Sequence, residues 1–233
     1  MKAKSISKRR LFIIAPILCV ILATLIFFLV FVVLRARTDI YSDTSVISDV
    51  LDRLQPRAIM LDSITIIVQP DDSSCGITAV AIVSNYYNHA DLDATALIER
   101  YNTRGSSHDD MIESLQGEIP GCAITLRKDV TDSEMLQEIH ASLSSSNPVL
   151  ICFGSLNPYN EPRYDFHASV VYGIDLDSET ITIANTYGFS EEISLVDFLN
   201  RMSYTEIRKY PLFQQFVLVL TNMQNRNAYF IVD

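Results

Sequence analysis

The feature that most limits the fold of this 233-residue chain is an uncharged apolar run near its start. Leu11 to Leu34 (LFIIAPILCVILATLIFFLVFVVL) are 24 consecutive residues without Asp, Glu, Lys, Arg or His. At 1.5 Å per residue, a helix of this length can cross a hydrocarbon core of about 30 Å. A cleaved signal peptide would have an apolar region of roughly 7 to 15 residues followed by small residues. This run ends at Arg35 and Arg37 instead, so we expect a retained transmembrane helix over residues 11–34.

The charges on either side of this run predict its orientation. Five of the seven Lys and Arg residues in positions 1–37 precede the run, and only Arg35 and Arg37 follow it closely. Because cytoplasmic flanks carry the excess of positive charge, residues 1–10 are expected to form a cytoplasmic tail. The rest of the chain is then expected to lie outside the cell, attached to the cell membrane by a single span.

Residues 38–233 are strongly acidic. They contain 11 of the 18 Lys and Arg residues and all 28 Asp and Glu residues, a net charge of −17. Such a surface repels phosphate backbones, and no Lys/Arg run outside the N-terminus could release counterions from nucleic acid. Nucleic-acid binding is therefore not expected.

We divide the outer part into a stalk or linker at residues 35–60 and one domain at residues 61–233, which is long enough for an ordinary core. Three cysteines lie outside the span, so at least one thiol is unpaired in a monomer. Cys122 and Cys152 could pair across a sheet, or could be buried free thiols. The absence of a CxxC pair or a close His/Cys cluster gives no support for a metal site, and no cofactor is expected. Oligomeric state is not predicted.

The apolar pattern predicts an α+β domain. Cys75 to Tyr87 is apolar on nearly every side, which indicates a buried central helix. Helices precede strands along the chain, so we expect helices on one side of an antiparallel sheet. The expected further helices are 94–101, 109–115, 131–143 with a Thr131/Glu134 capping box, and a short helix capped by Ser194. The expected strands are 63–68, 123–128, 149–153, 168–174, 180–184 and 228–232; residues 213–220 fit either a helix or a strand.

Cys75 is the candidate nucleophile. It stands at the predicted start of the central helix, where unsatisfied N–H groups and the helix dipole favour a thiolate and predict a lowered thiol pKa. Gly76 could leave room for a substrate carbonyl, or could simply be a glycine at a helix start. A buried structural cysteine is the alternative interpretation of Cys75.

His167 is the candidate base among the four histidines. It begins the expected strand 168–174, and a hairpin turn returns the chain to Asn185. Pairing sums near 352 or 353 would place Asn185 opposite His167 or Ala168, within reach of the imidazole. A purely structural Asn-Thr-Tyr-Gly turn is the alternative for Asn185.

Gln69 is the candidate oxyanion donor. An acyl-transfer site needs donors directed at the developing oxyanion, and the Gln69 amide and the Cys75 backbone N–H could supply two.

Three segments together resemble the C39 family of papain-like cysteine peptidases. They are Gln69-Pro-Asp-Asp-Ser-Ser-Cys75-Gly76, Phe166-His167-Ala-Ser-Val-Val-Tyr-Gly-Ile-Asp175, and Ile-Thr-Ile-Ala-Asn185-Thr-Tyr-Gly188. The resemblance implies a papain-like fold with Cys75 as nucleophile, His167 as base, Asn185 as orienting residue and Gln69 in the oxyanion hole. It also implies a peptide or protein substrate.

The chain departs from the family pattern in three ways. Ser74 stands where the family often has an acidic residue, and Asn185 where it often has Asp. Familiar members are cytoplasmic domains of ABC exporters that trim double-glycine leaders, so this substrate is not carried over to a chain with one expected span and no ATPase. The sequence predicts a membrane-anchored cysteine peptidase. The alternatives are a transglutaminase-like acyltransferase using the same residues, and a catalytically silent domain that binds peptides or proteins at the membrane.

Overall fold

The computed structural model describes residues 16–28, 48–105, 107–158, 164–205, 209–220 and 226–233. The chain divides into two compact units, Met1–Ile40 and Tyr41–Asp233. In the first unit, residues 16–28 are helical and their side chains are exposed. None of the helices in the described residues has both the length and the apolar character needed to span a membrane. The two ends of the predicted span, residues 11–15 and 29–34, lie outside the described residues.

The second unit contains a seven-stranded antiparallel sheet. Its main order is β2-β7-β3-β4-β5-β6, and β1 pairs with the end of β4 beside β3. The strands are β1 (Ala58–Met60), β2 (Ile124–Arg127), β3 (Val149–Leu156), β4 (Tyr164–Asp175), β5 (Thr180–Asn185), β6 (Phe189–Ser194) and β7 (Ala228–Val232). The strand β4 is the longest and joins β3, β1 and β5 into one sheet.

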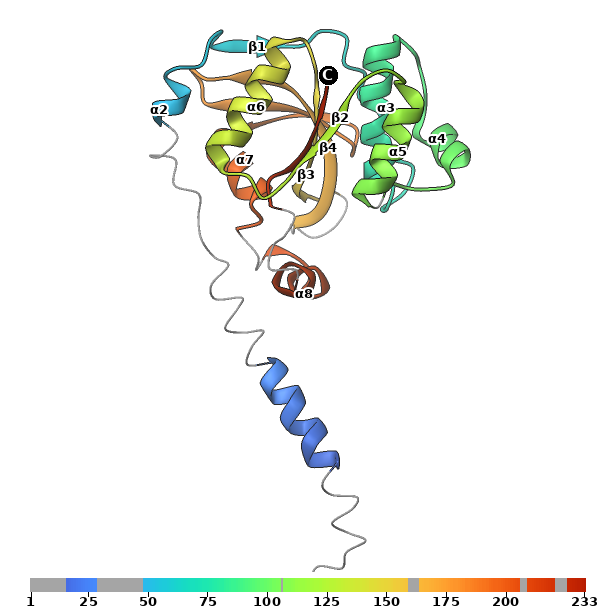
Figure 1. Cartoon of the computed structure of the whole chain (residues 1–233), viewed down its shortest axis with the longest axis vertical. Coiled ribbons are helices and arrows are strands. Elements are labelled where there is room, and N and C mark those ends of the chain that lie inside the picture. The colour runs from blue at the N-terminus through green and yellow to red at the C-terminus, as the bar shows by residue number, and fades with distance from the viewer. Residues whose placement is uncertain (1–15, 29–47, 106, 159–163, 206–208, 221–225) are drawn as a thin grey trace, which may run out of the picture. The chain divides into compact units, whose positions relative to one another are not determined.

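Helices cover both faces of this sheet, as Figure 1 shows. The helices are α2 (Ser48–Leu51), α3 (Cys75–Asn88), α4 (Ala94–Tyr101), α5 (His108–Glu118), α6 (Asp132–Ser144), α7 (Leu195–Met202) and α8 (Leu212–Leu220). One face carries α3, with α4 and α5 packed on it, and the other carries α6 and α7. The α+β class with an antiparallel sheet is confirmed, but the expectation of helices on one side only is wrong.

The alternation of apolar residues along β3 explains the two-sided packing. Val149, Ile151 and Phe153 belong to the core beneath α6 and α7, whereas Leu150 belongs to the core beneath α3. Successive side chains of a strand point to opposite faces, so a strand that is apolar at every position must be covered on both. Helix order along the chain did not contain this information.

The central helix forms as predicted, from Cys75 to Asn88. Every residue from Gly76 to Asn85 is buried, because α3 lies between the sheet and the helices α4 and α5. The predicted Thr131/Glu134 capping box of α6 and the Ser194 cap of α7 are both present.

The strand expected at residues 63–68 is absent, and residues 58–60 form β1 instead. Ser63 has a positive φ of 67°, which interrupts an extended run at its first residue. Ile64, Ile66 and Ile67 still pack against the core beneath α3 without strand pairing. The sheet therefore includes residues that the sequence analysis assigns to the stalk.

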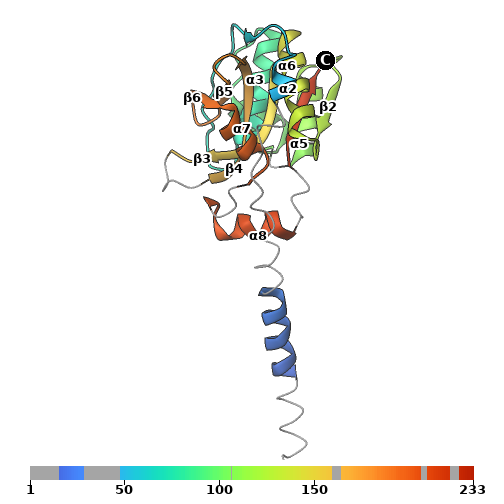
Figure 2. The ribbon, with the colours of Figure 1, turned by 90° about the vertical axis from the view of Figure 1, so that its left-hand side faces the viewer.

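The ambiguous segment 213–220 is helical and lies within α8. Two hydrogen bonds of Gln214 attach α8 to the start of β4, as the side chain accepts from the Phe166 N–H (3.2 Å) and donates to Asp165 Oδ1 (3.3 Å). Figure 2 shows α8 running across this end of the sheet. The attachment places α8 next to the strand that carries His167.

Candidate active site

A carboxylate in the preceding loop fixes the position of Cys75 at the first residue of α3. Asp71 Oδ1 accepts hydrogen bonds from Ser73 N (2.9 Å), Ser73 Oγ (2.8 Å) and Ser74 Oγ (2.6 Å). These contacts lower the pKa of Asp71, with the Ser74 hydroxyl as the main cause. Arg104 pairs with the other oxygen, Oδ2, at 3.1 Å. Asp71 therefore holds the loop residues Ser73 and Ser74 in place immediately before the candidate nucleophile.

Gly76 is required by a close backbone contact. A Cβ atom built on Gly76 would lie 1.9 Å from the carbonyl oxygen of Gly105, and the Ile77 N–H donates to the Arg104 carbonyl at 3.2 Å. Gly105 itself has a φ of +67°, which L side chains rarely adopt. The space beside Gly76 is therefore filled by the loop before α5, and not kept for a substrate carbonyl.

Cys75 and His167 line one cavity of about 310 Å³. The Cys75 sulfur is also hydrogen-bonded by the backbone of Ala168, the residue that follows His167 in β4. The structure therefore brings the first residue of α3 and the middle of β4 together, as the sequence predicts. Most of the remaining walls are apolar and come from α5, β4 and α8; they include Met111, Phe166, Ala168, Tyr204, Val217 and Leu218.

The register of the β4–β5 hairpin differs from the prediction. Val170 pairs with Ala184, which places Asn185 opposite Ser169 and diagonal to His167. A bulge at Tyr172 adds one residue to β4, and the loop has four residues between Asp175 and Thr180. Diagonal neighbours are still within side-chain reach, so the predicted contact survives the shift.

His167 is held on two sides. Its Nε2 lies 2.9 Å from Asn185 Oδ1 and 2.9 Å from Thr186 Oγ1. The ring stacks on Tyr187, with centroids 4.1 Å apart and planes inclined by 15°. Because the amide oxygen of Asn185 can only accept, the neutral imidazole carries its hydrogen on Nε2 and has its lone pair on Nδ1. This is the tautomer that a base needs if Nδ1 is to take a proton from a thiol.

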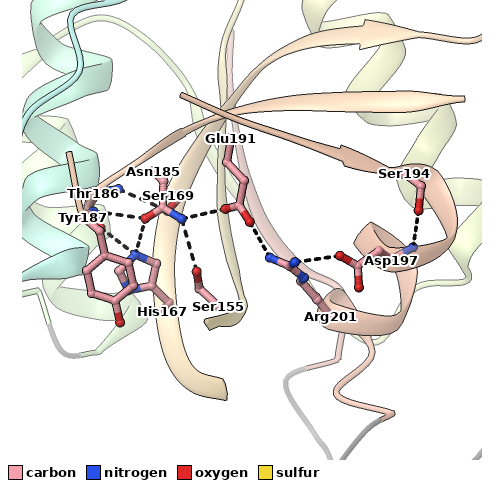
Figure 3. A network of polar contacts seen from close by, with 10 residues as sticks. All are labelled: Ser155, His167, Ser169, Asn185, Thr186, Tyr187, Glu191, Ser194, Asp197 and Arg201. Carbon is pink, nitrogen blue, oxygen red and sulfur yellow. Dashed lines mark hydrogen bonds and ion pairs between the residues drawn. The ribbon is translucent and has the colours of Figure 1, made fainter. Parts of the chain in front are cut away.

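The side chain of Asn185 is completely buried and uses both ends of its amide (Figure 3). Its oxygen accepts from His167 and from the Tyr187 N–H (3.0 Å). Its nitrogen donates to Glu191 Oε2 (2.7 Å) and to Ser155 Oγ (3.2 Å). These four contacts leave Asn185 one orientation, with the oxygen toward the imidazole.

Gln69 lies between the Cys75 loop and Thr186. Its Nε2 donates to the Asp71 carbonyl (2.9 Å), and its Oε1 accepts from Thr186 Oγ1 (3.2 Å). Its backbone N–H donates to the Thr186 carbonyl at 2.8 Å. One of the two amide hydrogens of Nε2 is used by Asp71, so the second stays available for another acceptor.

Burial shifts the pKa values of Cys75 and His167 in the directions that favour their neutral forms. Burial raises the pKa of the Cys75 thiol, and hydrogen bonds from the backbones of Ala168 and Gly76 only partly oppose this rise. Burial lowers the pKa of His167 to about 4, against the opposing effect of its hydrogen bond to Asn185. The expectation of a lowered thiol pKa at Cys75 is therefore wrong for the resting site, because desolvation outweighs the helix N-terminus.

All four cysteines are free thiols. The pairing of Cys122 with Cys152 that the sequence left open is not formed. Cys152 lines the same cavity as Cys75, and burial raises the pKa of its thiol above the ordinary value. No group of three or more His, Cys, Asp or Glu side chains suited to a metal ion occurs in the part of the chain that the structure describes.

Several residues at this site were missed by the sequence analysis. Thr186 and Tyr187 contact the imidazole directly, and Glu191 and Arg201 continue the hydrogen-bond network beyond Asn185. His108 begins α5 and lines the cavity. The position of Thr186 and Tyr187 directly after Asn185 was the available signal, whereas nothing in the sequence marked the pairing of Glu191 with Arg201.

A family model described as the Peptidase_C39 like family matches residues 61–212. The chain belongs to the Peptidase_C39 like family. No curated protein sequence matches the chain. Among solved structures, this family member is similar to the peptidase domain of Streptococcus ComA, a bifunctional ABC transporter involved in a quorum-sensing pathway. The identity is 14%, the TM-score is 0.44, and the match covers 73% of this chain and 98% of that one.

The pKa shift of His167 predicts the pH dependence of Cys75 alkylation. The imidazole must be neutral to accept the thiol proton, and its pKa is lowered to about 4. The rate of iodoacetamide labelling at Cys75, measured by peptide mass spectrometry, should therefore rise as the pH increases through about 4 and stay level through neutral pH. His167→Ala should remove this rise. A rise centred near 6.5, the ordinary imidazole value, would contradict the buried pair.

Proposed function

We propose that this protein is a cysteine peptidase that hydrolyses peptide or protein substrates with Cys75 as nucleophile and His167 as base. The observation that carries the proposal is the shared cavity of Cys75 and His167, with the imidazole held by Asn185 in the tautomer that leaves Nδ1 unprotonated. Family membership supports the same reaction class.

The first half of the reaction forms a thioester. Nδ1 of His167 takes the proton of the Cys75 thiol, and the sulfur attacks the carbonyl carbon of the scissile amide. In a desolvated cavity neither group ionises alone, so the charged state is reached by proton transfer within the pair. The imidazolium then gives its proton to the amide nitrogen, the C–N bond breaks, and the amine leaves.

The second half returns the free enzyme. Neutral His167 removes a proton from water, the resulting hydroxide attacks the thioester, and the Cys75 sulfur leaves and regains its proton from His167. In both halves a negative oxygen develops on the substrate carbonyl. The Cys75 backbone N–H and the second amide hydrogen of Gln69 are the donors that we assign to this oxyanion.

Peptide cleavage tests this function. Incubation of the purified protein with a mixture of peptides, followed by mass spectrometry, should yield new peptide termini. Cys75→Ala should abolish them, since the thioester cannot form, whereas the matched variant Cys122→Ala should retain them because Cys122 does not line the cavity.

Three other outcomes would contradict hydrolysis by Cys75. Amide products formed with an added primary amine, in excess over hydrolysis products, would indicate an acyltransferase. Equal cleavage by Cys75→Ala and the unaltered protein would separate the activity from this thiol. The absence of cleavage with an undiminished biological effect of Cys75→Ala would indicate a binding domain.

We also propose that residues 11–34 anchor the protein in the cell membrane with the peptidase domain outside. The 24-residue run without charged side chains and the Lys and Arg residues before it support this proposal. The protein should stay in the membrane fraction after an alkaline wash. Protease added to intact cells should digest residues 61–233 and spare an N-terminal tag. Release by the wash, or protection of the domain in intact cells, would contradict the anchor or its orientation.

A further inference from the structure

The orientation of the Asn185 amide depends on the partners at both of its ends: the Tyr187 N–H lies at the oxygen end, and Glu191 and Ser155 lie at the nitrogen end. An amide has nearly the same shape when its oxygen and nitrogen are exchanged, so only the partners decide which end faces His167. Turned around, Asn185 would direct N–H groups at the Tyr187 N–H and at the protonated Nε2. Its oxygen would at the same time face the Glu191 carboxylate. The acceptors at the nitrogen end are Glu191 at 2.7 Å and Ser155 at 3.2 Å, so Glu191 makes the shorter contact.

Glu191 is itself held by a buried cation. Its other oxygen, Oε1, lies 2.7 Å from Nη1 of Arg201, whose Nη2 lies 2.6 Å from Oδ2 of Asp197. The Arg201 side chain is only 6% exposed and its guanidinium lies over the ring of Tyr164. Figure 3 shows the resulting line of contacts from α7 through β6 to the imidazole. If the Arg201 guanidinium moved away from Glu191, it would remain a buried charge paired with Asp197 alone, which is unfavourable.

We propose that Glu191, held in place by Arg201, is a positioning residue that acts through Asn185 to keep the reactive tautomer of His167. This inference rests on the proposed function, because it assigns a role in the same reaction. In a Cys-His-Asp arrangement a carboxylate would contact the imidazole directly; here the carboxylate lies one residue further away, and the Asn185 amide connects the two.

The distance between the charge and the imidazole determines what Glu191 contributes. Arg201 neutralises much of the charge of Glu191, and the Asn185 side chain separates that charge from His167. The main effect is therefore geometric: Glu191 fixes the amide, the amide fixes the hydrogen on Nε2, and Nδ1 keeps its lone pair for Cys75. A residue with this role should affect kcat more than KM, since it does not line the substrate cavity.

Glu191→Gln tests the inference. The neutral amide of this variant cannot satisfy both Asn185 and Arg201 as an acceptor. In ¹⁵N-histidine-labelled protein, the NMR signals of His167 should report hydrogen on Nε2 in the unaltered protein and a mixture of tautomers in the variant. The His167→Ala spectrum assigns the signals, and the other three histidines serve as internal references. The kcat for a cleaved peptide should fall about 10-fold to 100-fold with little change in KM.

Glu192→Gln is the matched control, because Glu192 is the next residue on β6 and is exposed. It should leave both the tautomer and kcat unchanged.

A second variant, Glu191→Met with Arg201→Met, removes the acceptor without leaving a buried unpaired charge, which favours retention of the fold. It should show the same loss of tautomer control. An unchanged His167 tautomer in folded Glu191→Gln or in the double variant overturns the proposal. If Glu191→Gln and the double variant both unfold, the Glu191–Arg201 pair is needed for the fold, and the positioning role is overturned as well.

The two readouts separate this inference from the proposed function. The tautomer is measured without substrate, so altered His167 signals in a protein that cleaves no peptide would contradict the peptidase and keep the positioning role. Cleavage that depends on Cys75 but not on Glu191 would contradict only the positioning role.

Discussion

The hydrogen bond between His167 Nε2 and Asn185 Oδ1 is the contact on which the site depends. It joins two neighbouring strands across the β4–β5 hairpin and determines which imidazole nitrogen holds the hydrogen. The surrounding contacts serve to fix it: Tyr187 covers the ring, and Glu191 fixes the far end of the amide. On the other side of the cavity, the buried helix α3 and the loop closed by Asp71 hold the Cys75 sulfur against β4.

Desolvation determines the charges of Cys75 and His167. It raises the pKa of Cys75 and lowers that of His167 to about 4, so both groups are neutral at rest. The same low polarity strengthens the attraction between thiolate and imidazolium once a proton passes between them. In the proposed mechanism the thiolate forms by proton transfer from Cys75 to His167, so a free thiolate is not needed in the resting protein.

Sequence pattern predicted the elements of the fold better than their arrangement. The buried helix from Cys75, the capping box of α6 and most strands follow from local periodicity and capping, because these depend on nearby residues. The second helical layer depends on which strands become neighbours, and the bulge at Tyr172 depends on the pairing of β4 with β5, so neither could be deduced locally. Cys75, His167 and Asn185 were found as a motif, whereas the Glu191–Arg201 pair arises only when β6 and α7 meet in space.

The decisive measurement for the proposed mechanism is detection of an acyl group on Cys75. The protein is mixed with a peptide that it cleaves, quenched in acid within the first turnover, and analysed by intact-mass and peptide-mapping mass spectrometry. A mass increase equal to the N-terminal product less one water should be located on Cys75 and be removed by hydroxylamine, as expected for a thioester. An adduct on another residue would contradict Cys75 as the nucleophile. Cleavage without any adduct, under conditions in which the acyl form should accumulate, would contradict it as well.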